Sequence, residues 1–163
     1  GFLMKSTAAI HTSVKQEWRE RLLRNGVAAY YPLYALFRKN QSSWQLDSHT
    51  LLTYPTNSLG YALGLFLSQH QFELYDKCEN HDIFHVILNY DINVLDELKL
   101  VFCLLGNGRY TATNFLASIA GILLYPEHIT DFKHAYLRGR KLPLFHSKHF
   151  IAYLSQPFNL WKL

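Results

Sequence analysis

Apolar residues recur at helical spacing along most of the chain, and strict alternation of apolar and polar positions is nearly absent. Together with capping residues and glycine stops, this pattern predicts helices rather than strands. The helices are expected at about residues 14–25, 28–39, 59–70, 81–90, 94–105, 112–124 and 130–137, with a polar loop over 41–49. The sequence therefore predicts an all-α fold, a single-domain helical bundle.

The composition predicts that the surface binds a partner. The chain has 163 residues, of which 49% are hydrophobic, 15% aromatic and only 17% charged, against about 25% charged in a typical domain. These values exclude a disordered chain and predict an unusually apolar surface. The net charge is +4 but no long Lys/Arg run occurs, which argues against a dedicated nucleic-acid binder and suits an anionic lipid or a carboxylate ligand.

The two cysteines, Cys78 and Cys103, are too few for a disulfide scaffold and are expected to be reduced thiols. The first residues contain no sustained apolar segment, and the longest apolar stretch, about 115–125, is shorter than the ~20 residues that cross a bilayer. We therefore expect a cytoplasmic protein that has no membrane span but can lie peripherally on the inner face of a membrane.

The strongest chemical signal is a polar strip on the helix expected at 81–90. His81, Asp82, His85 and Asn89 fall within about 100° of its circumference, and apolar residues occupy the rest. A strip that simply faces solvent is the alternative, but such strips usually carry Lys, Glu, Gln or Arg. Two imidazoles at positions i and i+4 beside a carboxylate are typical of metal ligation.

Glu97 lies in the apolar stripe of the next helix, where an unpartnered carboxylate is costly. The turn over 89–93 makes the two helices antiparallel, and His85 and Glu97 each lie about one helical turn from it. The sequence thus predicts that they meet. The alternative is that Glu97 only complements the positive N-terminus of its own helix.

Two histidines and a carboxylate favour Zn²⁺ first, with Fe²⁺ or Mn²⁺ as alternatives. Asp82 is interpreted either as a fourth metal ligand or as a group that orients an imidazole. Cys78, three residues before His81, is assigned to packing, with metal ligation as the alternative. His146 and His149 lack a nearby carboxylate, so they and the isolated histidines are assigned to the surface or to packing.

The order His81-Asp82-x-x-His85, eleven residues, then Glu97 resembles the HDxxHx11E signature of the coenzyme Q biosynthesis protein four family. Three flanking segments, Pro55–Ala62, Asp96–Lys99 and Tyr136–Arg140, resemble further elements of that family in the same order. The resemblance covers a helical core at 52–163. The N-terminal helices at 1–51 match the family poorly, and we expect one domain overall.

The resemblance implies a metal-binding protein of ubiquinone biosynthesis that acts on a polyprenylated benzoic-acid precursor, with oxidative decarboxylation at C1. In this interpretation His81, Asp82, His85 and Glu97 are both the catalytic and the metal-binding residues. It further implies an apolar groove for the prenyl chain, a membrane surface, and a second copy of the chain or other quinone-biosynthesis proteins as partners.

Two further pairs of residues are candidates for substrate binding. Arg138 and Arg140 are assigned to a carboxylate or lipid phosphate, with ordinary solvated charges as the alternative. Gly60 and Gly64 are assigned to the prenyl groove, because glycines four residues apart allow close approach on one helix face; a plain core is equally economical.

A different class of function also fits: a prenyl-lipid-binding or scaffold protein that lacks catalytic activity and has a structural metal site. A phosphohydrolase with a His-Asp doublet needs another histidine and a distal aspartate, and the sequence designates neither. A metalloprotease is disfavoured because Asp82 stands where the motif H-E-x-x-H has its glutamate base.

Overall fold

The structure is a computed structural model that describes residues 17–22, 25, 44–71, 74 and 79–163. The chain divides into two units, residues 1–40 and 41–163. In the first unit, residues 17–22 and 25 are helical. The helix expected at 28–39 and the packing role of Cys78 lie outside the described residues.

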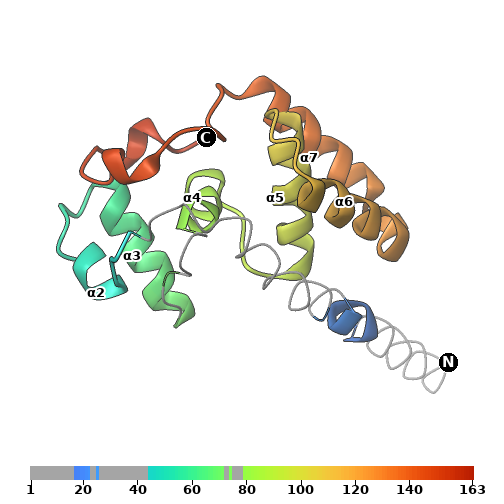
Figure 1. The fold of residues 1–163 in the computed structure, drawn as a ribbon, viewed down its shortest axis with the longest axis horizontal. Helices are drawn as coiled ribbons and strands as arrows, with labels where there is room; N and C mark the ends of the chain where they lie inside the picture. The colour runs from blue at the N-terminus through green and yellow to red at the C-terminus, as the bar shows by residue number, and fades with distance from the viewer. Residues whose placement is uncertain (1–16, 23–24, 26–43, 72–73, 75–78) are drawn as a thin grey trace, which may run out of the picture. The chain divides into compact units, whose positions relative to one another are not determined.

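The second unit is built from helices (Figure 1). Its described part contains α2 (Ser48–Leu51), α3 (Leu59–His70), α4 (Glu79–Leu88), α5 (Val94–Gly106), α6 (Ala112–Leu124) and α7 (Ile129–Lys141), with 3-10 turns at Pro126–His128, Phe150–Tyr153 and Phe158–Leu160. Within the described ranges there is no β-strand, only an isolated bridge between Ser58 and Pro157. The all-α prediction is confirmed.

Three differences between the predicted and the observed helix boundaries have a local reason. The short helix α2 begins at Ser48, within the loop expected over 41–49. The Asp47 side chain caps this helix by accepting a hydrogen bond from the amide of Thr50. Helix α4 ends at Leu88, because Asn89 has a left-handed backbone with φ 55°. Helix α7 continues through Gly139 to Lys141, because that glycine is held in a helix crossing.

Helices α5, α6 and α7 lie side by side, and α5 packs most extensively against α7 (Figure 1). The α5–α7 crossing is close because a glycine stands on each side of it. A Cβ at Gly106 would overlap the carbonyl of Tyr136, and a Cβ at Gly139 would overlap the carbonyl of Cys103. The crossing fixes α5, the helix that carries Glu97.

The start of α3 is completed by a distant part of the chain. The amides of Leu59 and Gly60 donate to the carbonyls of Gln156 and Leu154, at 2.9 and 2.7 Å, and the Ser58 hydroxyl accepts from the amide of Tyr61. These contacts satisfy helix N-terminal amides that have no partner within the helix. The C-terminal segment is thereby attached to α3.

The core lies between these elements. Its fully buried side chains come from α2, α3, α4, α5 and the segment after α7: Leu51, Leu59, Leu63, Leu67, Ile83, Phe84, Ile87, Leu88, Leu100, Phe145 and Phe150. Phe84 contacts Phe145 and Phe150 edge to face, with centroids 5.6 and 5.9 Å apart. The inner face of α4 is thus fixed by packing. None of the helices in the described ranges has the length and apolarity that a bilayer crossing requires.

Candidate metal centre

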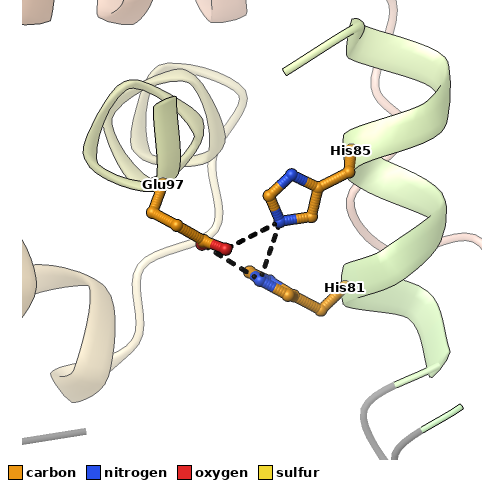
Figure 2. A group of neighbouring side chains, drawn as sticks. All are labelled: His81, His85 and Glu97. Atoms are coloured by element: carbon orange, nitrogen blue, oxygen red, sulfur yellow. Dashed lines mark hydrogen bonds and ion pairs between the residues drawn. The ribbon is translucent and has the colours of Figure 1, made fainter. Parts of the chain in front are cut away.

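His81 and His85 occupy successive turns on one face of α4, and their rings point the same way (Figure 2). Their Nε2 atoms lie 3.2 Å apart, and the rings meet edge to face with centroids 4.8 Å apart. Helical geometry brings residues i and i+4 together in this way. The spacing in the sequence therefore becomes a pair of nitrogen atoms aimed at one point.

His85 is held in one orientation by the turn that ends α4. Asn89 adopts the left-handed conformation, so the amide of Tyr90 donates back to the carbonyl of His85 at 3.1 Å, the bond that defines a Schellman turn. The carbonyl of Tyr90 then lies 3.1 Å from Nδ1 of His85. Because a carbonyl can only accept, Nδ1 carries the proton and Nε2 presents its lone pair in the neutral ring.

Glu97 reaches the same point from the first turns of α5. The Asn93 side chain caps that helix by accepting from the amide of Asp96, which sets where α5 begins. One carboxylate oxygen of Glu97 then lies 3.2 Å from Nε2 of His85, and the other lies 3.3 Å from Nε2 of His81 (Figure 2). The prediction that Glu97 meets both histidines is confirmed.

The three side chains could hold one metal ion, because their ligand atoms all lie within 4.8 Å of one another. The two Nε2 atoms lie 3.2 Å apart, and each lies 3.2 or 3.3 Å from a different carboxylate oxygen of Glu97. Ligands at ~2.05 Å from a tetrahedral ion are about 3.3 Å apart, which is the separation of the two imidazole nitrogens to within about 0.1 Å.

Electrostatics also favours a positive species between these groups. Burial lowers the pKa of His85, but hydrogen bonding to Glu97 and its charge outweigh this and raise the pKa overall. Burial raises the pKa of Glu97, but the hydrogen bonds from His81 and His85 hold it at about 2. The same surroundings that favour a proton on His85 favour a divalent cation, which can take the place of that proton.

One side of the cluster is open. The side chain of His85 is 2% exposed, whereas those of His81 and Glu97 are 40% and 38% exposed. The ligand set thus has a buried back and a solvent-facing front. Structural zinc sites are usually closed by four protein ligands, and catalytic sites keep a position for water or substrate. Three ligands with an open front correspond to the second type.

Asp82 lies beside this group but is not one of its three members. Its Oδ2 atom is buried and has no hydrogen-bond partner among the described residues. Burial raises the pKa of Asp82 to about 6, although His81 and His85 pull it down. Asp82 was predicted to be either a metal ligand or a group that orients an imidazole. Within the part of the chain that the structure describes, Oδ2 forms no hydrogen bond that would support either role, so the assignment stays a prediction.

The two arginines proposed for anion binding differ in their surroundings. The guanidinium of Arg138 donates to the carbonyls of Leu88 and Leu163, at 2.9 and 2.7 Å, and lies over the ring of Tyr90 with 5.1 Å to its centroid. Arg140 is exposed on the last turn of α7. Arg138 therefore binds main-chain oxygens at the end of α4.

Gly60 and Gly64 are both buried on α3, and the chain itself fills the face they share. A Cβ at Gly60 would lie 2.9 Å from the Tyr54 ring, and one at Gly64 would lie 2.9 Å from Leu51. The two glycines thus allow close packing of α3 against α2 and the residues that follow α2. A prenyl groove elsewhere in the fold stays a prediction.

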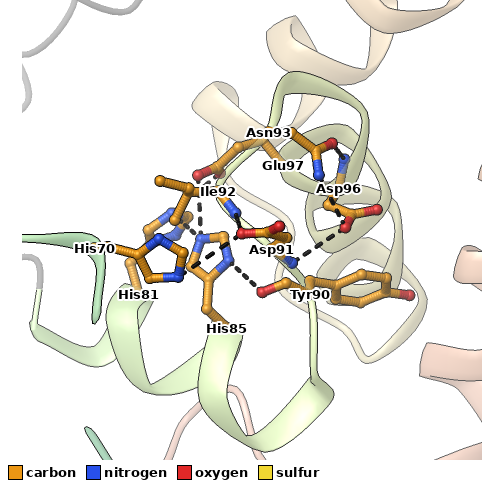
Figure 3. A network of polar contacts seen from close by, with 9 residues as sticks. All are labelled: His70, His81, His85, Tyr90, Asp91, Ile92, Asn93, Asp96 and Glu97. Carbon is orange, nitrogen blue, oxygen red and sulfur yellow. Dashed lines mark hydrogen bonds and ion pairs between the residues drawn. The ribbon is translucent and has the colours of Figure 1, made fainter. Parts of the chain in front are cut away.

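A wider polar network surrounds the cluster (Figure 3). His70, at the end of α3, lies 3.8 Å from a carboxylate oxygen of Asp91, and its ring contacts Phe66, which stacks on His85. Sequence reasoning assigned His70 to packing and missed this neighbourhood. It placed Asn89 in the polar strip and in the turn over 89–93, but did not predict its left-handed backbone; an asparagine just past a helix end was the available signal for such a cap.

Comparison with known proteins adds no assignment: no family model matches the chain, and no curated protein matches it.

Proposed function

We propose that the chain is a zinc protein whose metal centre is formed by His81, His85 and Glu97. The observation that carries the proposal is the convergence of two imidazole nitrogens, 3.2 Å apart, on the two carboxylate oxygens of Glu97, with the tautomer of His85 fixed by the carbonyl of Tyr90. Metal-binding histidines commonly donate their second ring N–H to such an oxygen, which makes the ligating nitrogen more basic.

Zinc is preferred over iron or manganese on the chemistry of the ligands. Imidazole nitrogen and carboxylate oxygen are common zinc ligands.

The open front of the site supports a catalytic role, and the resemblance to the coenzyme Q biosynthesis protein four family supplies a substrate class. We take the substrate to be a polyprenylated hydroxybenzoic acid, whose carboxylate or phenolate oxygen faces the exposed side chains of His81 and Glu97. Such a substrate partitions into membranes, and the net charge of +4 suits a peripheral position on an anionic surface.

The proposed reaction removes the carboxyl group from ring carbon C1. The bond between C1 and the carboxylate breaks, CO2 leaves, and the electron pair remains on the ring. In the oxidative form, dioxygen is the oxidant: one oxygen atom replaces the carboxylate at C1, the other leaves as water, and the para-hydroxybenzoic ring is oxidised to the quinone. A metal held by His81, His85 and Glu97 would act as a Lewis acid and would stabilise negative charge at a ring oxygen. The chain's own contribution is to hold His85 rigidly and to leave the His81 and Glu97 side open.

Metal analysis of the purified protein tests the site. We expect one equivalent of zinc in the native protein, and its loss in His81→Ala, His85→Ala and Glu97→Ala. His134→Ala is the matched control, because His134 is an exposed histidine on α7, outside the three-residue group. A protein that takes up no divalent metal, or whose uptake is unchanged in all three variants, overturns the zinc proposal.

Turnover separates catalysis from a structural metal. The zinc-loaded protein is given a polyprenylated hydroxybenzoic acid labelled with carbon-13 in its carboxyl group, and labelled CO2 is measured. We expect release that His81→Ala and Glu97→Ala abolish while circular dichroism stays unchanged. Retained zinc with no release, and unfolding when zinc is removed, would instead support a lipid-binding or scaffold protein with a structural metal.

A further inference from the structure

Helix α6 presents its bulky apolar residues outward. Its buried residues are Asn114, Ser118 and Gly121. Its exposed residues include five large apolar side chains, with exposed fractions of 40% to 73%: Phe115, Leu116, Ile119, Ile122 and Leu123. A surface helix usually turns its apolar stripe toward the core. This helix has the opposite orientation, so we call these five residues the outer face of α6.

The inward face of α6 is fully used by the fold. Gly121 lets α6 approach α5, because a Cβ there would lie 3.0 Å from the side chain of Leu98. The Asn114 amide donates to the carbonyl of Arg109, and the Ser118 hydroxyl donates to the carbonyl of Asn114. Rotating α6 to bury the outer face would expose these contacts and place bulky side chains where a glycine is needed.

The outer face has the pattern of a helix-packing seam. At 100° per residue its five members fall within about 120° of the helix circumference. Leu116, Ile119 and Leu123 follow the a, d, a spacing of a heptad, and Phe115 and Ile122 flank them on one side. This spacing matches the ridge that one helix presents to another, so a helix is the fitting occupant.

The exposed area is sufficient for a dimer. Tyr110, 66% exposed, extends the outer face because its ring stacks on Phe115 with centroids 6.2 Å apart. With about 200 Å² for each large side chain, these six residues expose roughly 700 Å². Specific complexes bury about 600 to 1,000 Å² on each partner. The face alone therefore reaches the lower part of that range.

Charge argues against an anionic bilayer as the occupant. From Ala112 to Leu124 the helix has no charged residue, so it lacks the Lys and Arg that membrane-surface helices use. Two exposed carboxylates, Glu127 and Asp131, follow near the C-terminal end of this helix. An uncharged seam is, in contrast, complementary to itself, as a twofold interface requires.

We propose that the outer face of α6 is the interface of a homodimer, in which α6 of one copy packs against α6 of a second copy about a twofold axis. The proposal is independent of the metal centre, which lies on α4 and α5. It assigns to α6 the apolar surface that the composition predicts. The seam residues Leu116 and Leu123 are expected to contribute most of the binding energy, because they are the most exposed of the five, at 59% and 73%.

The full chain at about 50 µM is examined by light scattering coupled to size-exclusion chromatography. We expect twice the monomer mass for the native protein, and the monomer mass for the double variant Leu116→Glu/Leu123→Glu. The matched control is Leu144→Glu/Leu160→Glu, because these leucines are 60% and 65% exposed outside α6; it should remain dimeric. A monomeric native protein, or a dimer that survives the α6 change, overturns the proposal.

A second measurement covers the case in which the glutamate variant does not fold. Ile119→Cys should form a disulfide-linked dimer on mild oxidation, and Leu160→Cys should not; equal cross-linking of both contradicts the proposal. Cosedimentation with vesicles of phosphatidylcholine and phosphatidylglycerol, three to one, tests the competing occupant. A monomer that binds these vesicles through the outer face also overturns it. Zinc content in the same variants reports separately on the metal centre.

Discussion

The carbonyl oxygen of Tyr90 lies 3.1 Å from Nδ1 of His85, so the turn that ends α4 fixes the tautomer and orientation of a buried imidazole (Figure 3). The contact depends on Asn89, whose φ of 55° reverses the chain at this point. A backbone conformation thus sets the direction of a candidate metal ligand. Removing one such supporting contact typically lowers metal affinity 10- to 100-fold.

Asn89→Val should weaken zinc binding about 10-fold or more, because a β-branched residue disfavours the left-handed conformation and moves the carbonyl of Tyr90. Titration with a competing chelator measures the affinity. Gln71→Val is the matched control, since Gln71 has φ 56° at the end of α3 and valine there has a similar conformational cost. It should lose stability but retain zinc affinity, and Asn89→Gly should retain both. Equal affinity loss in the two valine variants would refute the role of this turn.

The metal-free protein should be most stable near pH 4.5 and should lose stability as the pH rises toward 8. The raised pKa of His85 stabilises the fold below 6.5, and that stability is lost as the pH rises through the folded-state pKa. Asp82, with its pKa raised from 3.8 to about 6 by burial, stabilises the fold while it is protonated, and this contribution is lost between about pH 4 and pH 6. Glu97, held at about 2, stabilises above 4.5 and loses this contribution as the pH falls toward 2.

Zinc should reverse the alkaline trend, because it takes the place of protons on the ligands. Melting temperatures with EDTA and with excess zinc, from pH 5 to pH 8, measure both curves. We expect the EDTA curve to fall between pH 6 and 8 and the stabilisation by zinc to grow over the same range. Asp82→Asn should flatten the EDTA curve between pH 5 and pH 6, where the Asp82 carboxyl ionises. A metal-free melting temperature that rises from pH 6 to 8 would contradict the assigned pKa shifts.

The α5–α7 crossing should not tolerate a methyl group at its glycines. Gly106→Ala and Gly139→Ala each place a Cβ against the main-chain carbonyl of the other helix, which cannot move aside. We expect a loss of more than about 3 kcal/mol in the free energy of unfolding, or failure to fold. Gly121→Ala is the control, because its Cβ meets only the flexible side chain of Leu98 and alanine favours the helix. Denaturant unfolding measures all three; equal losses would show that the crossing has no special role.

Arg138 and Arg140 should separate in their effects on stability. Arg138→Met removes the donors to the carbonyls of Leu88 and Leu163, and we expect a loss of about 1–3 kcal/mol. Arg140→Met, at an exposed position, should change stability by less than about 0.5 kcal/mol. Thermal unfolding provides the comparison. If Arg138→Met were as stable as the native protein, its contacts at the end of α4 would have no energetic role.

Much of the fold could be predicted because local rules dominate it. Ser58, Asn93 and Thr111 each cap the helix that follows by accepting a backbone amide, so α3, α5 and α6 begin where the sequence indicates. The start of α7 was placed at Thr130, but a 3-10 turn over Pro126–His128 leads directly into the helix at Ile129. Its end was placed four residues early, because a glycine inside a tight crossing resembles a helix stop in sequence.

The sequence by itself determined the all-α class and the meeting of His81, His85 and Glu97, because helical periodicity and one short turn place all three residues near the same end of a hairpin. Only the tertiary structure decided how these groups are used. Packing leaves His85 2% exposed and its two partners open, and binds Arg138 to main-chain carbonyls. It also turns the apolar side of α6 outward. Periodicity identifies a helix face, but which face is buried depends on contacts between residues far apart in the chain.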